Sequence, residues 1–188
     1  MNLKNKKLGI CLTKDLVSKK DFFLKMNLIN NFEKIAILNS YDYNTMNLYN
    51  TRIKSLKNPF WKEIRYKENE IIEFEKENKL DILLIIANEE IISKLANNIF
   101  DNWVTKIAGY QLMKNKPIVL GIYASDGLSI NAENIGRLLT RKNYYFIPFK
   151  QPNPFTKPYF LSYDANCISK TIENALIRKQ IQPILVSL

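Results

Sequence analysis

The stretch Leu80-Asp81-Ile82-Leu83-Leu84-Ile85-Ile86-Ala87 decides the fold of this chain. Its segment from Ile82 to Ala87 is the longest apolar run in the sequence, and no polar residue alternates with the apolar ones. A strand without such alternation is covered on both faces, as the central strands of parallel sheets are. The sequence therefore predicts a buried parallel strand over residues 80–87.

Strand and helix patterns alternate along the rest of the chain. Apolar runs predict strands at residues 7–13, 33–39, 117–123 and 144–149. Helical periodicity predicts helices around Val17–Leu28, at 68–78, from an N-cap at Asn88 through Ile99, at 104–114, at 130–141 and around Ile168–Leu176. This alternation with right-handed crossovers predicts one α/β domain over residues 1–188, a three-layer αβα sandwich with a mainly parallel sheet.

Composition narrows the chemistry that the chain can perform. The 188 residues include no histidine and two cysteines, which excludes Ser-His and Cys-His nucleophiles and most zinc or iron sites, so we expect no metal. Cys11 lies in an apolar stretch, which predicts a buried, inert thiol. No apolar run approaches the about 20 residues that span a bilayer, and no signal-peptide core follows the basic start. We therefore expect a soluble, cytoplasmic protein without a membrane partner.

The formal charge of +10 raises the question of nucleic acid. Most cations are lysines, and no recognition helix, zinc finger or aromatic-studded basic strand appears, so we interpret them as scattered surface charges and expect no nucleic acid partner. One stretch differs. Residues 137–157 hold five cations and no acid, which favours an anionic small molecule or an acidic partner surface; the cations are Arg137, Arg141, Lys142, Lys150 and Lys157.

Polar loops follow two neighbouring strands of the predicted sheet. In open α/β sheets, ligands bind outside the carboxyl ends of the strands. The loop of residues 124–131 reads Ala-Ser-Asp-Gly-Leu-Ser-Ile-Asn, and Gly127 permits a backbone with positive φ. The proline-rich loop of residues 148–154 follows the next strand. The two loops together predict a pocket wall, although a plain helix entry, capped by Ser129 and favoured by Asp126, explains the first loop equally well.

No nucleotide-binding fingerprint accompanies these loops. The loop after the first strand reads Thr13-Lys14-Asp15 and lacks glycine, and no Walker A sequence occurs in the chain. The domain is therefore not expected to bind a nicotinamide cofactor itself.

Several motifs resemble those of one family. They are Ser93-Lys94-Leu95-Ala96-Asn97 with Asp101, Val119-Leu120-Gly121-Ile122 with Asp126, Leu128 and Asn131, Arg141-Lys142-Asn143, Phe146-Ile147-Pro148-Phe149 with Gln151, Pro154, Lys157 and Pro158, Thr171-Ile172-Glu173, and Gln182-Pro183-Ile184-Leu185. From about Leu80 to Leu185 the chain closely resembles the B subunits of bacterial dipicolinate synthase. That family has the flavoprotein-like, Rossmann-type fold of the phosphopantothenoylcysteine decarboxylases. Upstream, Gly9, Thr13 and Asn50-Thr51-Arg52 also fit the family, and the rest of the N-terminal half is loosely similar.

The resemblance implies a function. It implies an oxidoreductase subunit that acts with an A subunit to oxidise dihydrodipicolinate to dipicolinate during sporulation, in the mother cell of a spore-forming bacterium. The A subunit of the family carries the NAD(P)-binding domain, and the substrate is a small dicarboxylate. For the substrate, the resemblance implies Arg52 as carboxylate contact, Asn131 and Ser125 as further contacts, and Asp126 as proton acceptor. The implied cofactor, FMN, would meet Thr13, Asn88 and Ser129.

The turns that hold the flavin phosphate in the fold's flavin-binding members differ here. The chain has Thr13-Lys14-Asp15 after the first strand and Ala87-Asn88-Glu89-Glu90 after the central one. Two acids there would each repel a phosphate by about 1–4 kcal/mol. An ordinary charged first turn of a helix is an equally good explanation of the acid pair. We expect the purified protein to lack FMN.

Two alternative functions and an assembly stay open. The alternatives to the oxidoreductase subunit are a catalytically silent subunit that stabilises the A partner, and a stand-alone flavin-dependent decarboxylase or reductase. Aromatic residues at Tyr41, Tyr43 and Tyr49, and the loop Pro152–Phe160, predict an oligomer, with itself or with the A subunit.

Overall fold

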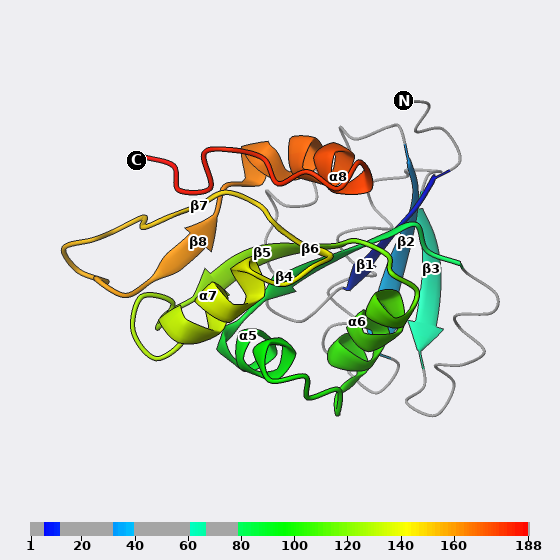
Figure 1. Cartoon of the computed structure of the whole chain (residues 1–188), viewed down its shortest axis with the longest axis horizontal. Helices are drawn as coiled ribbons and strands as arrows, with labels where there is room; N and C mark the ends of the chain where they lie inside the picture. Colours follow the sequence, from blue (N-terminus) through cyan, green and yellow to red (C-terminus); the bar gives the residue numbers. More distant parts are fainter. Residues whose placement is uncertain (1–5, 12–31, 40–60, 67–78, 188) are drawn as a thin grey trace.

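The computed structural model describes residues 6–11, 32–39, 61–66 and 79–187 (Figure 1). The predicted helices around Val17–Leu28 and at 68–78, and the loop Tyr41–Arg52, lie outside these residues. The strands are β1 (Lys6–Cys11), β2 (Phe32–Asn39), β3 (Trp61–Tyr66), β4 (Ile82–Ala87), β5 (Ile118–Ala124), β6 (Tyr144–Phe146), β7 (Phe149–Lys150) and β8 (Leu161–Tyr163). The helices are α5 (Glu89–Ala96), α6 (Trp103–Met113), α7 (Ala132–Leu139), the 3₁₀ turn η2 (Ala165–Cys167) and α8 (Ile168–Leu176).

The described strands form one sheet in the order β3-β2-β1-β4-β5-β8-β7, with β6 also paired to β5. Strands β1 to β6 pair in parallel, whereas β8 runs antiparallel to both β5 and β7. The prediction of a mainly parallel sheet is confirmed.

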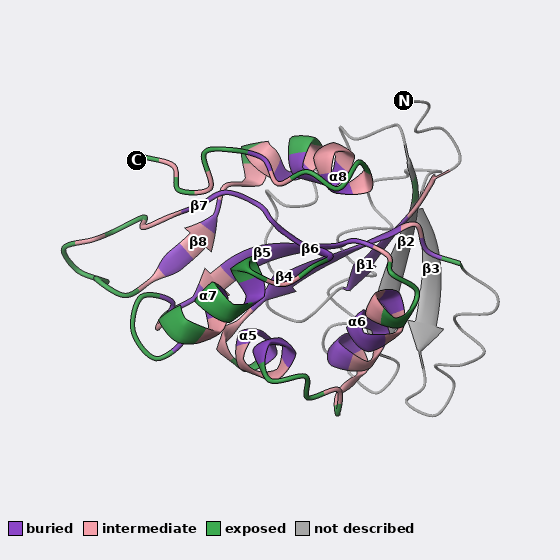
Figure 2. Cartoon of the chain, in the orientation of Figure 1, coloured by how far each residue is buried: buried purple, intermediate pink, exposed green. Residues whose placement is uncertain are grey.

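Strand β4 lies in the centre of this sheet, and all six of its residues are buried. Leu83, Ile85 and Ala87 pack into a cluster with residues of α5, α6 and α7. Ile82 and Ile86 belong to a second cluster that contains residues of α8. Figures 1 and 2 show α8 on one face of the sheet and α5, α6 and α7 on the other, with the buried strands between them. The predicted three-layer αβα sandwich is therefore confirmed, and the buried Cys11 with it.

The predicted strand at residues 144–149 is divided in two. Strand β6 ends at Phe146, and Phe149 pairs antiparallel with Tyr163. Pro148, between them, has no backbone N–H and cannot donate to a ladder. The side chain of Gln180 takes over part of the pairing, because its Oε1 accepts from the Phe146 N–H at 2.6 Å and its Nε2 donates to the Phe146 carbonyl at 2.7 Å.

Other boundaries also differ from the predictions. No strand was predicted for β3 or β8. The strand predicted at residues 7–13 is confirmed as far as Cys11, and residues 12–13 lie outside the described residues. Helix α5 ends at Ala96, which leaves Ile99 45% exposed instead of on a buried helix face. Among the described residues, the helices are too short or too polar to cross a membrane.

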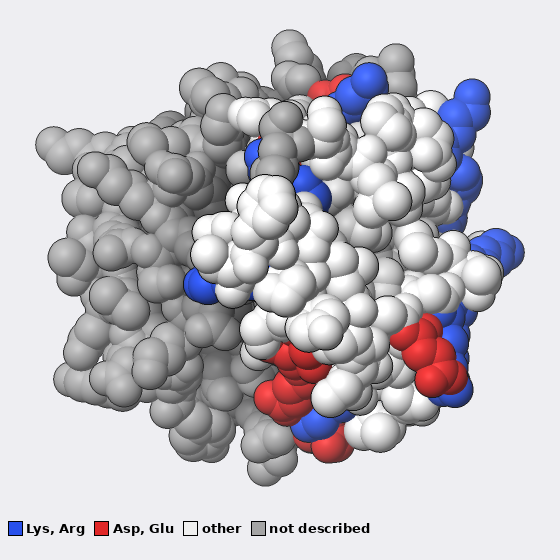
Figure 3. Space-filling model, turned by 90° about the vertical axis from the view of Figure 1, so that its left-hand side faces the viewer, with Lys and Arg blue, Asp and Glu red and all other residues white. Residues whose placement is uncertain are grey.

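Charge is unevenly spread over the face shown in Figure 3. The described Lys and Arg side chains lie mainly along one margin of this face, and the Asp and Glu side chains form separate groups. Most of the described surface between them consists of uncharged residues. Arg137 and Arg141, from the cationic stretch 137–157, bind parts of the protein itself: Arg137 pairs with Glu133, and Arg141 with the end of α5.

The guanidinium group of Arg141 donates hydrogen bonds to carbonyl groups at the carboxyl end of α5. Its Nη1 donates to the Leu95 carbonyl at 3.0 Å and to Asn98 Oδ1 at 2.7 Å, and its Nη2 donates to the Ala96 carbonyl at 2.6 Å. The last carbonyls of a helix have no partner within the helix. Arg141 therefore joins the segment after α7 to α5.

We expect Arg141→Ala to lower the free energy of unfolding by about 1.5–3 kcal/mol, because charged donors are lost from half-buried carbonyls. Urea denaturation measures this loss. Arg137→Ala is the matched control: its exposed contacts with Glu133 and with the Asn97 side chain should contribute about 0.5 kcal/mol. Equal losses in the two variants would contradict the role given to Arg141.

Candidate functional site

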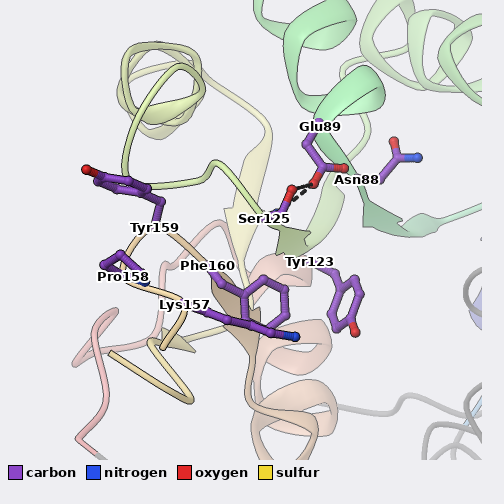
Figure 4. A pocket seen from close by; sticks show the side chains of 8 residues that line it. All are labelled: Asn88, Glu89, Tyr123, Ser125, Lys157, Pro158, Tyr159 and Phe160. Atoms are coloured by element: carbon purple, nitrogen blue, oxygen red, sulfur yellow. Dashed lines mark hydrogen bonds between the residues drawn. The ribbon is translucent and has the colours of Figure 1, made fainter. Parts of the chain in front are cut away.

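A pocket of about 630 Å³ lies at the carboxyl ends of β4 and β5 (Figure 4). These strands are neighbours, and Ala87 lies opposite Ile122 in their parallel register. The residues that follow them, Asn88 and Ser125, are therefore brought to one edge of the sheet. The pocket is lined by Asn88, Glu89, Tyr123, Ser125, Lys157, Pro158, Tyr159 and Phe160.

Glu89 and Ser125 connect the two strand ends. Glu89 Oε1 accepts hydrogen bonds from the backbone N–H and the hydroxyl of Ser125, both at 2.6 Å. Burial raises the pKa of the Glu89 carboxyl, but the bonds from the Ser125 hydroxyl, the Ser125 amide and its own amide outweigh burial and hold the pKa below its ordinary value. Glu89 is therefore a carboxylate at neutral pH.

Asn88 begins helix α5. Its Oδ1 accepts from the Ile91 N–H at 3.1 Å, which confirms the predicted N-cap. The cap fixes the first turn of α5, and this turn carries Glu89 into the pocket.

The opposite wall of the pocket is aromatic and basic. The rings of Tyr123 and Phe160 meet edge to face, with centroids 5.1 Å apart. Lys157 Nζ lies 5.8 Å from the centroid of the Phe160 ring. Because β8 pairs with the end of β5, the loop that precedes β8 brings Lys157 and Phe160 beside Tyr123. Such a wall can pack against a flat ring and offers a cation to an anionic group.

Asp126 and Asn131 come together beside the pocket. Asn131 Nδ2 lies 3.0 Å from both carboxylate oxygens of Asp126, and Asn134 Nδ2 donates to Asn131 Oδ1 at 2.9 Å. Asn131 is buried. The lining of the described pocket includes neither residue. This network holds the loop after β5 in place.

The same loop differs from the predicted helix entry. Helix α7 begins at Ala132 after Asn131, two residues later than predicted, and Ser129 does not cap it: the Ser129 hydroxyl donates to the Asp126 carbonyl at 3.2 Å. Gly127 does not adopt a positive φ. Glycine at this position leaves room for the Leu161 side chain, since a Cβ there would lie only 3.0 Å from it.

The predicted site residues are thus divided. Ser125 and Asn88 line the pocket, Asp126, Asn131 and Ser129 lie in the adjoining loop, and Arg52 and Thr13 are outside the described residues. Their functional roles stay predictions. The described residues contain no group of three or more acids or cysteines arranged to hold a metal ion.

Sequence reasoning did not select Tyr123, Lys157 and Phe160 as site residues. Lys157 was visible as part of the cationic stretch and of the family motifs. Its place in the pocket depends on β8, whose three residues are too few for a periodic pattern.

Comparison with known proteins supports the resemblance seen in the sequence. No protein-family profile matches the chain. The B subunit of dipicolinate synthase from Bacillus subtilis (strain 168) is 44% identical over 95 residues, which cover 50% of this chain and 48% of that protein. The chain therefore spans about half the length of the curated relative it matches.

Solved structures extend the likeness to the whole chain. The crystal structure of the dipicolinate synthase B subunit from Bacillus halodurans C has a TM-score of 0.82 and 29% identity, covering 100% of this chain and 99% of that one. A dodecameric FMN-dependent Ubix-like decarboxylase from Escherichia coli O157:H7 shares the fold, with a TM-score of 0.52 and 15% identity over 92% of each chain. The resemblance to the B subunits of dipicolinate synthase and the flavoprotein-like fold are confirmed.

The Escherichia coli decarboxylase depends on FMN, a flavin that carries a phosphate. The described residues do not fit its phosphate. The Ser125 N–H and hydroxyl, which could donate to a phosphate, already bind Glu89, whose charge would repel the phosphate.

The lowered pKa of Glu89 predicts a pH-dependent stability. We expect Glu89→Gln to cost about 1 kcal/mol of unfolding free energy near neutral pH, because the two hydrogen bonds from Ser125 lose their charge assistance. The folded pKa lies below the ordinary value of 4.5. The stabilisation is therefore present above this value and is lost as the pH falls through the folded pKa.

Urea denaturation of both proteins from neutral pH down to about pH 3 measures this dependence. The difference between wild type and Glu89→Gln should shrink on acidification. Glu90→Gln is the control, because Glu90 pairs with Lys94 on the surface. A constant difference for Glu89→Gln across the pH range would contradict the prediction.

Proposed function

We propose that the chain acts as the B subunit of a dipicolinate synthase, with an A subunit, in the oxidation of dihydrodipicolinate to dipicolinate. The observation that carries this proposal is the pocket at the ends of β4 and β5, with a lysine beside two aromatic rings. A cyclic dicarboxylate needs both features: a flat wall for its ring and a cation for a carboxylate. The likeness to the B subunits of dipicolinate synthase supports the same function.

The residues have separate roles in this proposal. Lys157 and Arg52 bind carboxylates of the substrate, and Ser125 and Asn131 help to orient it. Oxidation removes a hydride and a proton: the hydride passes to NAD(P) on the A subunit, and Asp126 accepts the proton. The complex, rather than this chain alone, is the active enzyme.

The proposal includes an assembly. Phe155 and Tyr159, in the loop between β7 and β8, are 96% and 55% exposed. Apolar side chains with such exposure favour burial against another chain. We place the contact with the A subunit, or with further copies of this chain, at this loop, in the cytoplasm of a sporulating mother cell.

Mixing the purified chain with the A subunit tests the function. We expect NAD(P)-dependent formation of pyridine-2,6-dicarboxylate, followed by its ultraviolet absorbance, only when both chains are present. Lys157→Ala should raise the Michaelis constant about 10-fold with a smaller change in turnover, because a charged contact to the substrate is lost.

Lys142→Ala is the matched control, since Lys142 is an exposed cation outside the pocket. Product formation by the A subunit alone at the same rate would contradict the proposal. Equal effects of Lys142→Ala and Lys157→Ala would contradict the role of Lys157.

A second candidate function is a structural subunit that stabilises the A subunit. It is favoured by the contacts of Asp126, whose two oxygens both lie 3.0 Å from the Asn131 amide in a network that holds a loop. In this case the reacting groups would all belong to the A subunit.

Asp126→Asn separates the two functions. The catalytic proposal expects a folded complex with turnover reduced roughly 100-fold, because the proton acceptor is lost. Turnover of the reconstituted complex and its mass by light scattering are measured together. Wild-type turnover in an intact complex would instead support the structural function.

A further inference from the structure

The carboxylate of Glu89 accepts the hydrogen bonds that Ser125 could otherwise donate to an anionic ligand in the pocket. Glu89 Oε1 receives the N–H and the hydroxyl of Ser125, both at 2.6 Å. Backbone N–H groups at a helix start and a serine hydroxyl are typical donors to bound phosphates and carboxylates. Here two such donors, both from Ser125, converge on a side chain of the protein itself.

The position of this contact follows from the sheet. Glu89 is the first residue of α5 and is separated from the end of β4 only by Asn88, the N-cap of the helix. Ser125 directly follows β5. The two strands are parallel neighbours, so the helix start and the Ser125 donors lie at one edge. An anion that enters there must displace Glu89 and withstand its charge.

The neighbouring acid does not share this role. Glu90 is exposed, and its carboxylate binds Lys94 at 2.7 Å and the Asn102 amide at 3.3 Å. Figure 4 shows the Glu89 side chain directed at Ser125, inside the pocket. Of the acid pair in the first turn of α5, only Glu89 touches the donors of the pocket.

We infer that Glu89 is a built-in anion that excludes phosphate-bearing ligands, FMN among them, from the donors at the ends of β4 and β5. Glu89 is thus a specificity residue, which selects ligands that present no phosphate at this end of the pocket. The inference concerns binding alone and does not depend on dipicolinate synthesis.

Paired measurements with FMN and riboflavin test the inference, because the two flavins differ only in the phosphate. Their dissociation constants are determined by flavin fluorescence on the folded, full-length chain. Wild type should bind FMN no more tightly than riboflavin. Glu89→Ala should raise the affinity for FMN relative to riboflavin at least about 10-fold, because the freed donors can bind the phosphate.

Two further variants sharpen the result. Glu90→Ala removes the same charge one residue away and should leave the ratio of the two affinities within about 2-fold of wild type. Ser125→Ala in the Glu89→Ala background removes the hydroxyl donor and should reverse part of the gain. Circular dichroism checks that each variant is folded.

Three results would overturn the inference. The first is that wild type binds FMN at least about 10-fold more tightly than riboflavin. The second is that folded Glu89→Ala shows the wild-type ratio of FMN to riboflavin affinity, or no saturable FMN binding. The third is that Glu90→Ala gains as much relative FMN affinity as Glu89→Ala. If Glu89→Ala does not fold, Glu89→Gln replaces it: this variant removes the charge but keeps an acceptor, so a smaller gain is expected, and an unchanged ratio overturns the inference.

Discussion

The burial of β4 on both faces is the constraint on which the rest of this structure depends. All six residues of the strand are buried, and they face α8 on one side and α5, α6 and α7 on the other. A strand in this position needs parallel neighbours and helical crossovers. These in turn bring the segments that follow β4 and β5 to one edge of the sheet, where Asn88, Glu89 and Ser125 meet.

The pocket has two chemically different ends. At one end, the Glu89 carboxylate and the Ser125 donors satisfy each other. At the other, Lys157 lies beside the rings of Phe160 and Tyr123. A ligand that carries a carboxylate toward Lys157 and no anionic group toward Glu89 matches both ends. The second carboxylate of a substrate would then need a cation from elsewhere, and Arg52 is the proposed source.

The core of the fold could be predicted from the sequence because strong patterns encode it. The run Ile82–Ala87, the helical spacing after Asn88 and the apolar stretch at residues 117–123 each gave the correct element. Short elements escaped, since β7 has two residues and β8 has three, and neither length carries a periodic signal. Pairing with β5 and β7, rather than local sequence, makes residues 161–163 a strand.

The position of the pocket in the fold could be predicted from the sequence better than the contacts inside it. The polar loop of residues 124–131, at a strand end, pointed to the edge of the sheet where the pocket lies. That Glu89 binds Ser125, 36 residues away in the chain, depends on the parallel register of β4 and β5. Asp126 is a similar case, because its contact with Asn131 depends on where α7 begins.

The side chain of Gln180 has a consequence for the behaviour of the folded protein in concentrated solution. Its amide binds both the N–H and the carbonyl of Phe146, as a residue on a neighbouring strand would. In the described sheet β6 pairs with β5 alone, so its other side would present open backbone groups. Exposed strand edges recruit strands from other molecules and lead to aggregation. Gln180 thus satisfies the outward backbone groups of Phe146 without an additional strand, and these groups are not available to a strand from another molecule.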